Sequence, residues 1–161
     1  MVDIETRSLT LVLESPEDVR ARLAGMSPSE KRELSPDWLA LVDSATSANP
    51  WIHGFAVVQR IDSAVVGSCG FKGPPTPDGV VEIAYGVAPE YQGRGYATEA
   101  AQALVSYAFS YSRVRVVRAH TLPEANASTH VLAKCGFQCV GEVIDPDDGL
   151  VWRWEKHDDA A

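Results

Sequence analysis

Cysteine is scarce in this chain of 161 residues, which contains only Cys69, Cys135 and Cys139. The number is odd and no C-x-x-C pair is present, so neither a disulfide scaffold nor a zinc site of ordinary spacing is expected. The four histidines show no metal-ligand spacing either, and we therefore predict free thiols and no metal.

Positive charge and long apolar runs are also lacking. Fourteen Lys and Arg face 22 Asp and Glu, for a formal net charge of −8, which argues against nucleic-acid binding through a basic face. No apolar run is long enough to span a bilayer, and Asp3 and Glu5 stand where a signal peptide would be apolar. We expect a cytoplasmic protein with no membrane partner, whose acidity suits a cationic acceptor molecule or simply keeps the chain in solution.

Two common phosphate-binding patterns are missing as well. The chain has no G-x-G-x-x-G, and no Gly-Lys-Ser/Thr follows a glycine-rich turn. What it has is the stretch from Val80 to Ala108. Apolar residues alternate from Val81 to Val87, which indicates a strand, and a glycine-rich turn then leads into a segment with helical apolar spacing from Ala97 to Ala108.

A strand, a glycine-rich turn and a helix start make a suitable site for an anion. The first N–H groups of a helix have no acceptor within it, and the helix dipole adds partial positive charge there. Gly93 and Gly95 allow positive φ and close approach of a ligand, and Arg94 adds a cation suited to phosphate. The pattern favours a ligand that carries a pyrophosphate.

Gln92-x-x-Gly95-x-Ala97, placed between a strand with Glu82 and an amphipathic helix, resembles motif A of the GNAT superfamily of N-acetyltransferases. The wider phrase from Glu82 to Ala100 is similar to the branch of ribosomal-protein N-terminal acetyltransferases. The resemblance implies acetyl-CoA as co-substrate and no metal. It implies cofactor binding by Tyr85, Gly86, Val87, Gln92, Gly93, Arg94, Gly95, Tyr96, Ala97, Thr98 and Asn126.

The element order predicts one α/β (α+β) domain over residues 1–161, with a mixed, mostly antiparallel sheet flanked by helices. Serine-proline pairs at residues 15–16, 27–28 and 35–36 indicate three early helix starts. Strands are predicted at residues 8–13, 55–59, 64–71, 81–87, 114–121, 137–144 and 150–155, and a further helix at 127–134. The family resemblance implies that the fourth and fifth strands splay, with a bulge for which Gly86 is suited.

Amine acetylation needs a group that removes a proton from the amine, a donor to the oxyanion and a proton for the leaving thiolate. Glu82 is the candidate base, because it shares a strand face with the small residues Ala84 and Gly86, which leave room beside its carboxylate. The alternative is a solvated glutamate on the strand face. The resemblance suggests that a Glu at this position acts through ordered water, and that backbone N–H groups near Gly86 and Val87 meet the thioester.

The acid for the thiolate is the element in which this chain departs from the family. Asn126-x-Ser128 and the closing Gly136-Phe137 resemble motif B, but Leu132 stands where many members carry a tyrosine. In the similar branch a serine lies near the sulfur, so Ser128 is the second candidate catalytic residue. Ser128 and Asn126 are also suited to cap a helix start.

These features predict an acetyl-CoA-dependent N-acetyltransferase in which a primary amine, either a protein N-terminus or a small amine, attacks the thioester directly. The alternative is an acyl-CoA-binding regulatory module without transferase activity, which the loss of the tyrosine at Leu132 favours. A third hypothesis is a nucleotide-binding protein, which would bind ATP at least as tightly as acetyl-CoA. Members of the family often dimerise, so the resemblance also allows a homodimer.

Overall fold

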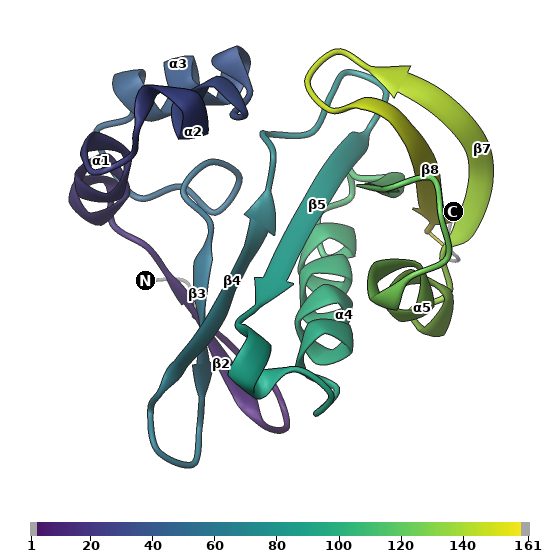
Figure 1. Ribbon diagram of the computed structural model, residues 1–161, viewed down its shortest axis with the longest axis horizontal. Helices are drawn as coiled ribbons and strands as arrows, with labels where there is room; N and C mark the ends of the chain where they lie inside the picture. The colour runs from purple at the N-terminus through teal and green to yellow at the C-terminus, as the bar shows by residue number, and fades with distance from the viewer. Residues whose placement is uncertain (1–2, 159–161) are drawn as a thin grey trace.

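The computed structural model describes residues 3–158, and its centre is one sheet whose strand order is β1-β2-β3-β4-β5-β6-β8-β7 (Figure 1). The strands are β1 Asp3–Glu5, β2 Leu9–Leu13, β3 Phe55–Gln59, β4 Val65–Phe71, β5 Val80–Val87, β6 Val116–Thr121, β7 Gln138–Asp145 and β8 Gly149–His157. Every neighbouring pair is antiparallel except β5 and β6, which are parallel. The predicted mixed, mostly antiparallel sheet is confirmed.

Three short helices, α1 Pro16–Ala24, α2 Pro28–Arg32 and α3 Pro36–Ser44, follow β2, and each begins with proline after a capping serine. This arrangement is the one that the three serine-proline pairs predict, because proline lacks only an N–H that has no helical acceptor there. A 3₁₀ turn, η1 Pro89–Tyr91, leads toward α4 Tyr96–Phe109, and α5 Ala127–Lys134 precedes β7.

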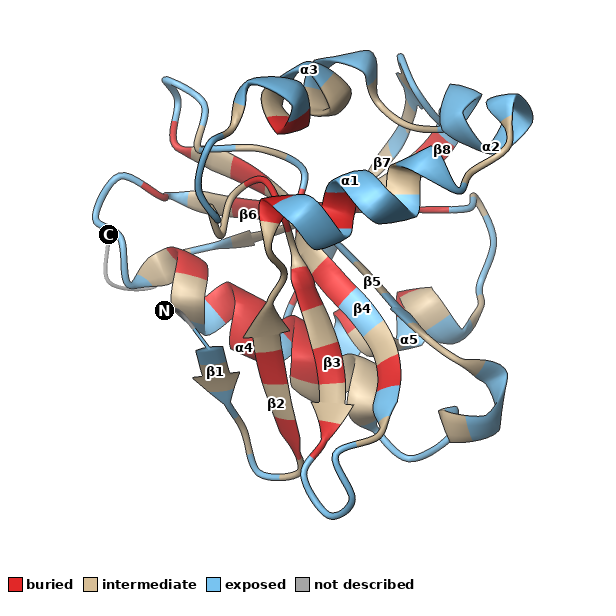
Figure 2. Cartoon of the chain, turned by 90° about the vertical axis from the view of Figure 1, so that its left-hand side faces the viewer, coloured by how far each residue is buried: buried red, intermediate tan, exposed pale blue. Residues whose placement is uncertain are grey.

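The core lies between the sheet and α4, which packs on β2, β4 and β5, while α5 packs on α4. Figure 2 shows buried residues alternating with less buried ones along β2 and β3, as expected of strands with one covered face. Leu11, Phe55, Leu104 and Leu132 are fully buried in this core. A smaller cluster around Val42 joins α1 and α3.

The sheet opens between β5 and β6. Their ladder holds only three residue pairs, Val80 with Val116, Val81 with Val117 and Glu82 with Arg118. Beyond Glu82, β5 continues to Val87 beside β4 while β6 continues to Thr121 beside β8. The predicted splay is therefore confirmed, and it frees one edge of β5 from residue 83 onward.

Two details differ from the sequence-based expectations. No bulge is found at Gly86, because the β4–β5 register runs without interruption from Phe71–Ile83 to Gly67–Val87. Divergence of the two strands alone frees the edge of β5, so no extra residue is needed. Bulges lie instead at Val57/Val58 and at Cys139/Gly141, and two short elements, β1 and η1, were not predicted. None of the helices within residues 3–158 is long and apolar enough to cross a membrane.

Candidate active site

The glycine-rich turn presents the start of α4 without a capping side chain. Gly95 is the N-cap residue of α4 and, like Gly93, has a φ of +81°, a conformation that costs glycine little. A Cβ atom added at either glycine would meet no heavy atom within 4 Å. The other four α-helices of the described chain begin with a side-chain cap, from Ser15, Ser27, Ser35 and Asn126. The first N–H groups of α4 are therefore available to an anion.

A cavity of about 530 Å³, here called the α4 cavity, opens in front of this helix start. It extends from the splayed edge of β5 to one side of α5, from Ala127 to Lys134. Ser128 and nine of the eleven predicted cofactor-binding residues line it: Tyr85, Gly86, Val87, Gln92, Gly93, Gly95, Tyr96, Ala97 and Thr98. The turn and the strand edge that the sequence singled out thus face one shared space.

Two predicted cofactor-binding residues lie outside the lining of the α4 cavity. The Arg94 guanidinium stacks over the ring of Tyr91, with its carbon 5.3 Å from the ring centre. Asn126 caps α5, where its side-chain oxygen accepts a hydrogen bond from the Thr129 N–H at 3.0 Å. Gln92 lines the cavity, and its amide donates to the Val87 carbonyl at 2.9 Å, which ties the turn to the end of β5.

A second cavity of about 480 Å³, here called the hairpin cavity, lies on the other side of β5. Its walls come from the α2–α3 region, from β4 and β5, and from the turn between β7 and β8, and Figure 1 shows these helices and this turn flanking the start of β5. Its ionisable lining is mixed but mainly acidic, with Glu14, Glu33, Asp147 and Asp148 against Arg22 and Lys72. Ala84 and Gly86 line it, as expected of small residues that leave room on their face of β5.

His53 also lines the hairpin cavity, and only 1% of its surface is exposed. Its Nδ1 accepts a hydrogen bond from the Asn49 N–H at 2.9 Å, so in the neutral ring Nε2 carries the proton. Nε2 has no partner in the described part of the chain. Burial is the main reason that the pKa of His53 lies below its ordinary value, which keeps the ring neutral.

The two candidate catalytic residues meet at a third, smaller cavity of about 110 Å³, here called the Glu82 cavity. Glu82, Ser128 and Tyr85 all line it. Glu82 Oε2 lies 3.1 Å from His120 Nδ1 and 3.0 Å from Lys72 Nζ. Burial alone would raise the pKa of Glu82, but the hydrogen bond from His120 and the charge of Lys72 outweigh burial and hold this pKa below its usual value. Glu82 is therefore ionised at neutral pH.

Ser128 lies across the splay from β5. Its Oγ is 3.2 Å from the Tyr85 hydroxyl, and this contact connects β5 to α5. Burial raises the pKa of Tyr85, so its phenol keeps its proton. Leu132 is fully buried in the core, so the position of the usual family tyrosine does not open into the cavity here. A hydroxyl pair, Tyr85 and Ser128, stands near the free edge of β5 instead.

Several lining residues were missed by sequence reasoning. His120 and Lys72 contact Glu82, and His130 and Lys134 line the α4 cavity. No sequence signal links Lys72, after β4, or His120, on β6, to Glu82, since only the folded sheet brings them together. Cys135 is a free thiol, as predicted, and its burial raises its pKa, so the thiol keeps its proton.

Residues 5–138 match the family model described as the acetyltransferase (GNAT) domain, which covers most of the chain. The chain belongs to the GNAT acetyltransferases. An uncharacterized N-acetyltransferase p20 of Bacillus licheniformis is 31% identical over 91 residues, which is 56% of this chain and 51% of that protein. The alignment thus covers only about half the length of these curated relatives.

Solved structures share the fold of this GNAT chain over nearly its whole length. A ribosomal-protein-S5-alanine acetyltransferase from Vibrio fischeri has a TM-score of 0.67 at 21% identity, covering 99% of this chain and 98% of that one. The aminoglycoside acetyltransferase AAC(6')-Ib in complex with coenzyme A has a TM-score of 0.65 at 20% identity, with 95% and 96% covered. At these identities the likeness shows the fold.

Proposed function

We propose that this protein is an acetyl-CoA-dependent N-acetyltransferase, acting as one domain in the cytoplasm, in which a primary amine attacks the thioester directly. One observation carries the proposal. The α4 cavity and the hairpin cavity, on opposite sides of β5, share Tyr85 and Gly86. An acetyl donor in the first and an amine in the second would meet at this segment, where β5 has no β6 partner.

The residues of the α4 cavity fit the donor. Its pyrophosphate would lie at the uncapped start of α4, where Gly93 and Gly95 place no side chain in the way. Its pantetheine amides would pair with the free edge of β5 near Tyr85, Gly86 and Val87, since unpaired strand N–H and C=O groups accept an extended partner. AAC(6')-Ib, which shares this fold, has been solved in complex with coenzyme A.

The acceptor side fits a cationic amine that must lose a proton before attack. Glu82 is ionised and acts as the base, taking the proton directly or through a water molecule. A carboxylate with a lowered pKa is a weak base toward an alkylammonium, so desolvation of the amine in the hairpin cavity has to reduce the amine's own affinity for the proton. The oxyanion would meet a backbone N–H near Gly86, and Ser128 would donate to the departing thiolate.

The carboxylates that line the hairpin cavity support a positively charged amine as the acceptor. Solved neighbours include a ribosomal-protein acetyltransferase and an aminoglycoside acetyltransferase, so both a protein N-terminus and a small polyamine-like molecule belong in the acceptor screen. The family resemblance also allows a homodimer, which analytical ultracentrifugation would test.

The test begins with calorimetric titration of the protein with acetyl-CoA, with ATP as the control, and continues with thiol release in the presence of peptides and small amines. Saturable binding of acetyl-CoA but not ATP, with turnover on at least one amine, is expected. Glu82→Gln should keep donor affinity and lose turnover. Donor binding without turnover on any amine would instead favour the regulatory acyl-CoA-binding module, and ATP binding of equal strength would favour a nucleotide-binding protein.

A further inference from the structure

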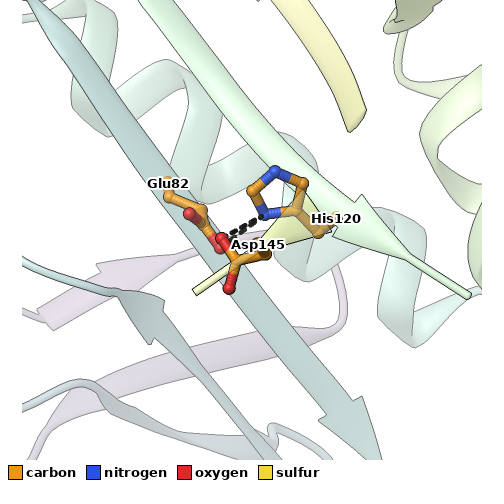
Figure 3. A group of neighbouring side chains, drawn as sticks. All are labelled: Glu82, His120 and Asp145. Carbon is orange, nitrogen blue, oxygen red and sulfur yellow. Dashed lines mark hydrogen bonds and ion pairs between the residues drawn. The ribbon is translucent and has the colours of Figure 1, made fainter. Parts of the chain in front are cut away.

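Glu82, His120 and Asp145 converge from three strands, β5, β6 and β7 (Figure 3). Their nearest ligand-type atoms lie within 4.8 Å of one another. Two carboxylates and an imidazole at this spacing have the composition of a divalent-metal site. The hydrogen bonds around His120 decide between a metal and a proton as the bridge of this cluster.

His120 uses both ring nitrogens. Arg153 Nε lies 3.0 Å from His120 Nε2, and because arginine stays protonated it can only donate. Nε2 therefore accepts and carries no hydrogen. The hydrogen of the neutral ring must then be on Nδ1, which lies 3.1 Å from Glu82 Oε2 and donates to it.

This tautomer does not suit a metal. Nδ1, the nitrogen that faces the two carboxylates, holds a hydrogen and offers no lone pair. Lys72 Nζ already forms an ion pair with Glu82 Oε2 at 3.0 Å and another with Asp148 Oδ2 at 3.3 Å. The cluster is thus organised by protons, with a cation already in place.

We propose that His120, held as the Nδ1–H tautomer by Arg153, is a positioning residue that orients Glu82 and keeps it ionised as the base for the acceptor amine. The proposal rests on the proposed function of Glu82. His120 side-chain atoms are only 4% exposed, which leaves the ring little freedom to turn. Lys72 and His120 both hold Oε2, and no hydrogen bond to Oε1 is found between residues 3 and 158, so Oε1 is the oxygen left for the amine or its water.

The ionisable groups facing Glu82 come from each element around it. Lys72 follows β4, His120 is on β6, and Asp145 ends β7 with its Oδ1 3.9 Å from His120 Nδ1. Tyr85 and Ser128 line the Glu82 cavity, and Asp148 forms an ion pair with Lys72. Lys72 supplies charge, whereas His120 supplies a directed neutral donor. Removing the donor while burial remains must raise the pKa of Glu82.

The tautomer can be tested without any activity. Protein labelled with ¹⁵N-histidine would be examined by long-range ¹H–¹⁵N correlation, with the His120 signals assigned by their loss in His120→Asn. The expected spectrum has a protonated Nδ1 and an unprotonated Nε2 near neutral pH. The reverse tautomer, or a fully protonated ring, would overturn the proposal whether or not the protein is an acetyltransferase.

The positioning role is tested by the pH profile of kcat/KM in a matched pair of variants. Asparagine keeps an amide donor near the Nδ1 position, whereas His120→Leu has similar size and no donor. His120→Leu should move the acidic limb up by about half to one pH unit and lower kcat/KM below that limb, with acetyl-CoA affinity unchanged. His120→Asn should restore the wild-type limb, and His157→Ala, at an exposed ring, is the control.

Equal profiles for His120→Leu and wild type, or equal shifts in the leucine and asparagine variants, would refute the role of the donor. If the leucine variant does not fold, His120→Gln replaces it, since the glutamine amide mimics Nε2 and leaves Glu82 without its donor. A wild type that binds acetyl-CoA but acetylates no amine would count against the proposed function, and the spectrum would still decide the tautomer.

Discussion

Gly95→Val separates the two things that the residue does, which are shaping the backbone and leaving space for a ligand. Gly95 has a φ of +81° and caps α4. A β-branched residue is strained there, at a cost on the order of 1–3 kcal/mol. No heavy atom lies within 4 Å of an added Cβ, so the strain is conformational and not a clash. For a domain of this size the melting temperature should fall by about 2–4 °C per kcal/mol.

The second effect is on the ligand. The new side chain would stand in the α4 cavity, where the pyrophosphate is proposed to approach the N–H groups of α4. Loss of that approach should weaken acetyl-CoA binding at least tenfold, which corresponds to about 1.4 kcal/mol. The assay is calorimetric titration at a temperature well below the melting point of the variant, so that only folded protein is measured.

Gly141→Val is the matched control. Gly141 has a φ of +129° and likewise no heavy atom within 4 Å of an added Cβ, but it lies in β7 and lines none of the three cavities. It should lose stability and keep its affinity for acetyl-CoA. If folded Gly95→Val binds acetyl-CoA as tightly as the Gly141 variant, the pyrophosphate does not lie at the start of α4, and the reasoning is refuted.

Three further outcomes are expected. Ser128→Ala should lower kcat about tenfold with donor affinity kept, since it removes one hydrogen bond to a charged leaving group; an unchanged kcat would exclude Ser128 from this step. Leu132→Tyr should not raise kcat and should cost about 1–3 kcal/mol by overpacking, because residue 132 is fully buried; a gain in kcat with full stability would show that this position reaches the sulfur. Because the pKa of Glu82 is lower in the folded than in the unfolded protein, its ionised form stabilises wild type relative to Glu82→Gln above about pH 4.3. This difference in stability should vanish as the pH falls through the lowered pKa of folded Glu82. Thermal melts of both proteins from pH 3 to 6 would test this, and a difference in melting temperature that does not change with pH would show that the pKa shift is absent.

The sequence was most informative where structure is local. The alternation in β5, the prolines after Ser15, Ser27 and Ser35, and the glycines before α4 each reflect backbone preferences that act over a few residues, and the structure bears them out. The prediction of a bulge at Gly86 was wrong, and the reason is physical. Glycine permits irregular backbone without requiring it, and here the divergence of β6 already frees the strand edge.

The candidate site was predictable on its donor side and poorly predictable on its acceptor side. The residues that line the α4 cavity come largely from one continuous stretch, so a motif can mark them. Lys72 and His120 reach Glu82 across the sheet from positions 10 and 38 residues away in the sequence, and pairing of this kind depends on strand order and register. Arg94 shows a different limit of sequence-based prediction. An arginine in this turn is suited to bind phosphate, but where its side chain points depends on the fold, and here it stacks on Tyr91.

The splay explains why the site needs side-chain bridges at all. Backbone pairing between β5 and β6 ends at Glu82, so from there on other contacts must hold β5 to the elements across the opening, β6 and α5. Glu82 with His120 spans the opening where it begins, and Tyr85 with Ser128 spans it farther along β5. Each bridge contains a group that can carry or donate a proton. Both bridges line the Glu82 cavity, and Tyr85 and Ser128 also line the α4 cavity proposed for the acetyl donor. The contacts that stabilise the opened sheet are therefore the same ones that supply its candidate base and acid, which is why their replacement should affect stability and pH dependence together.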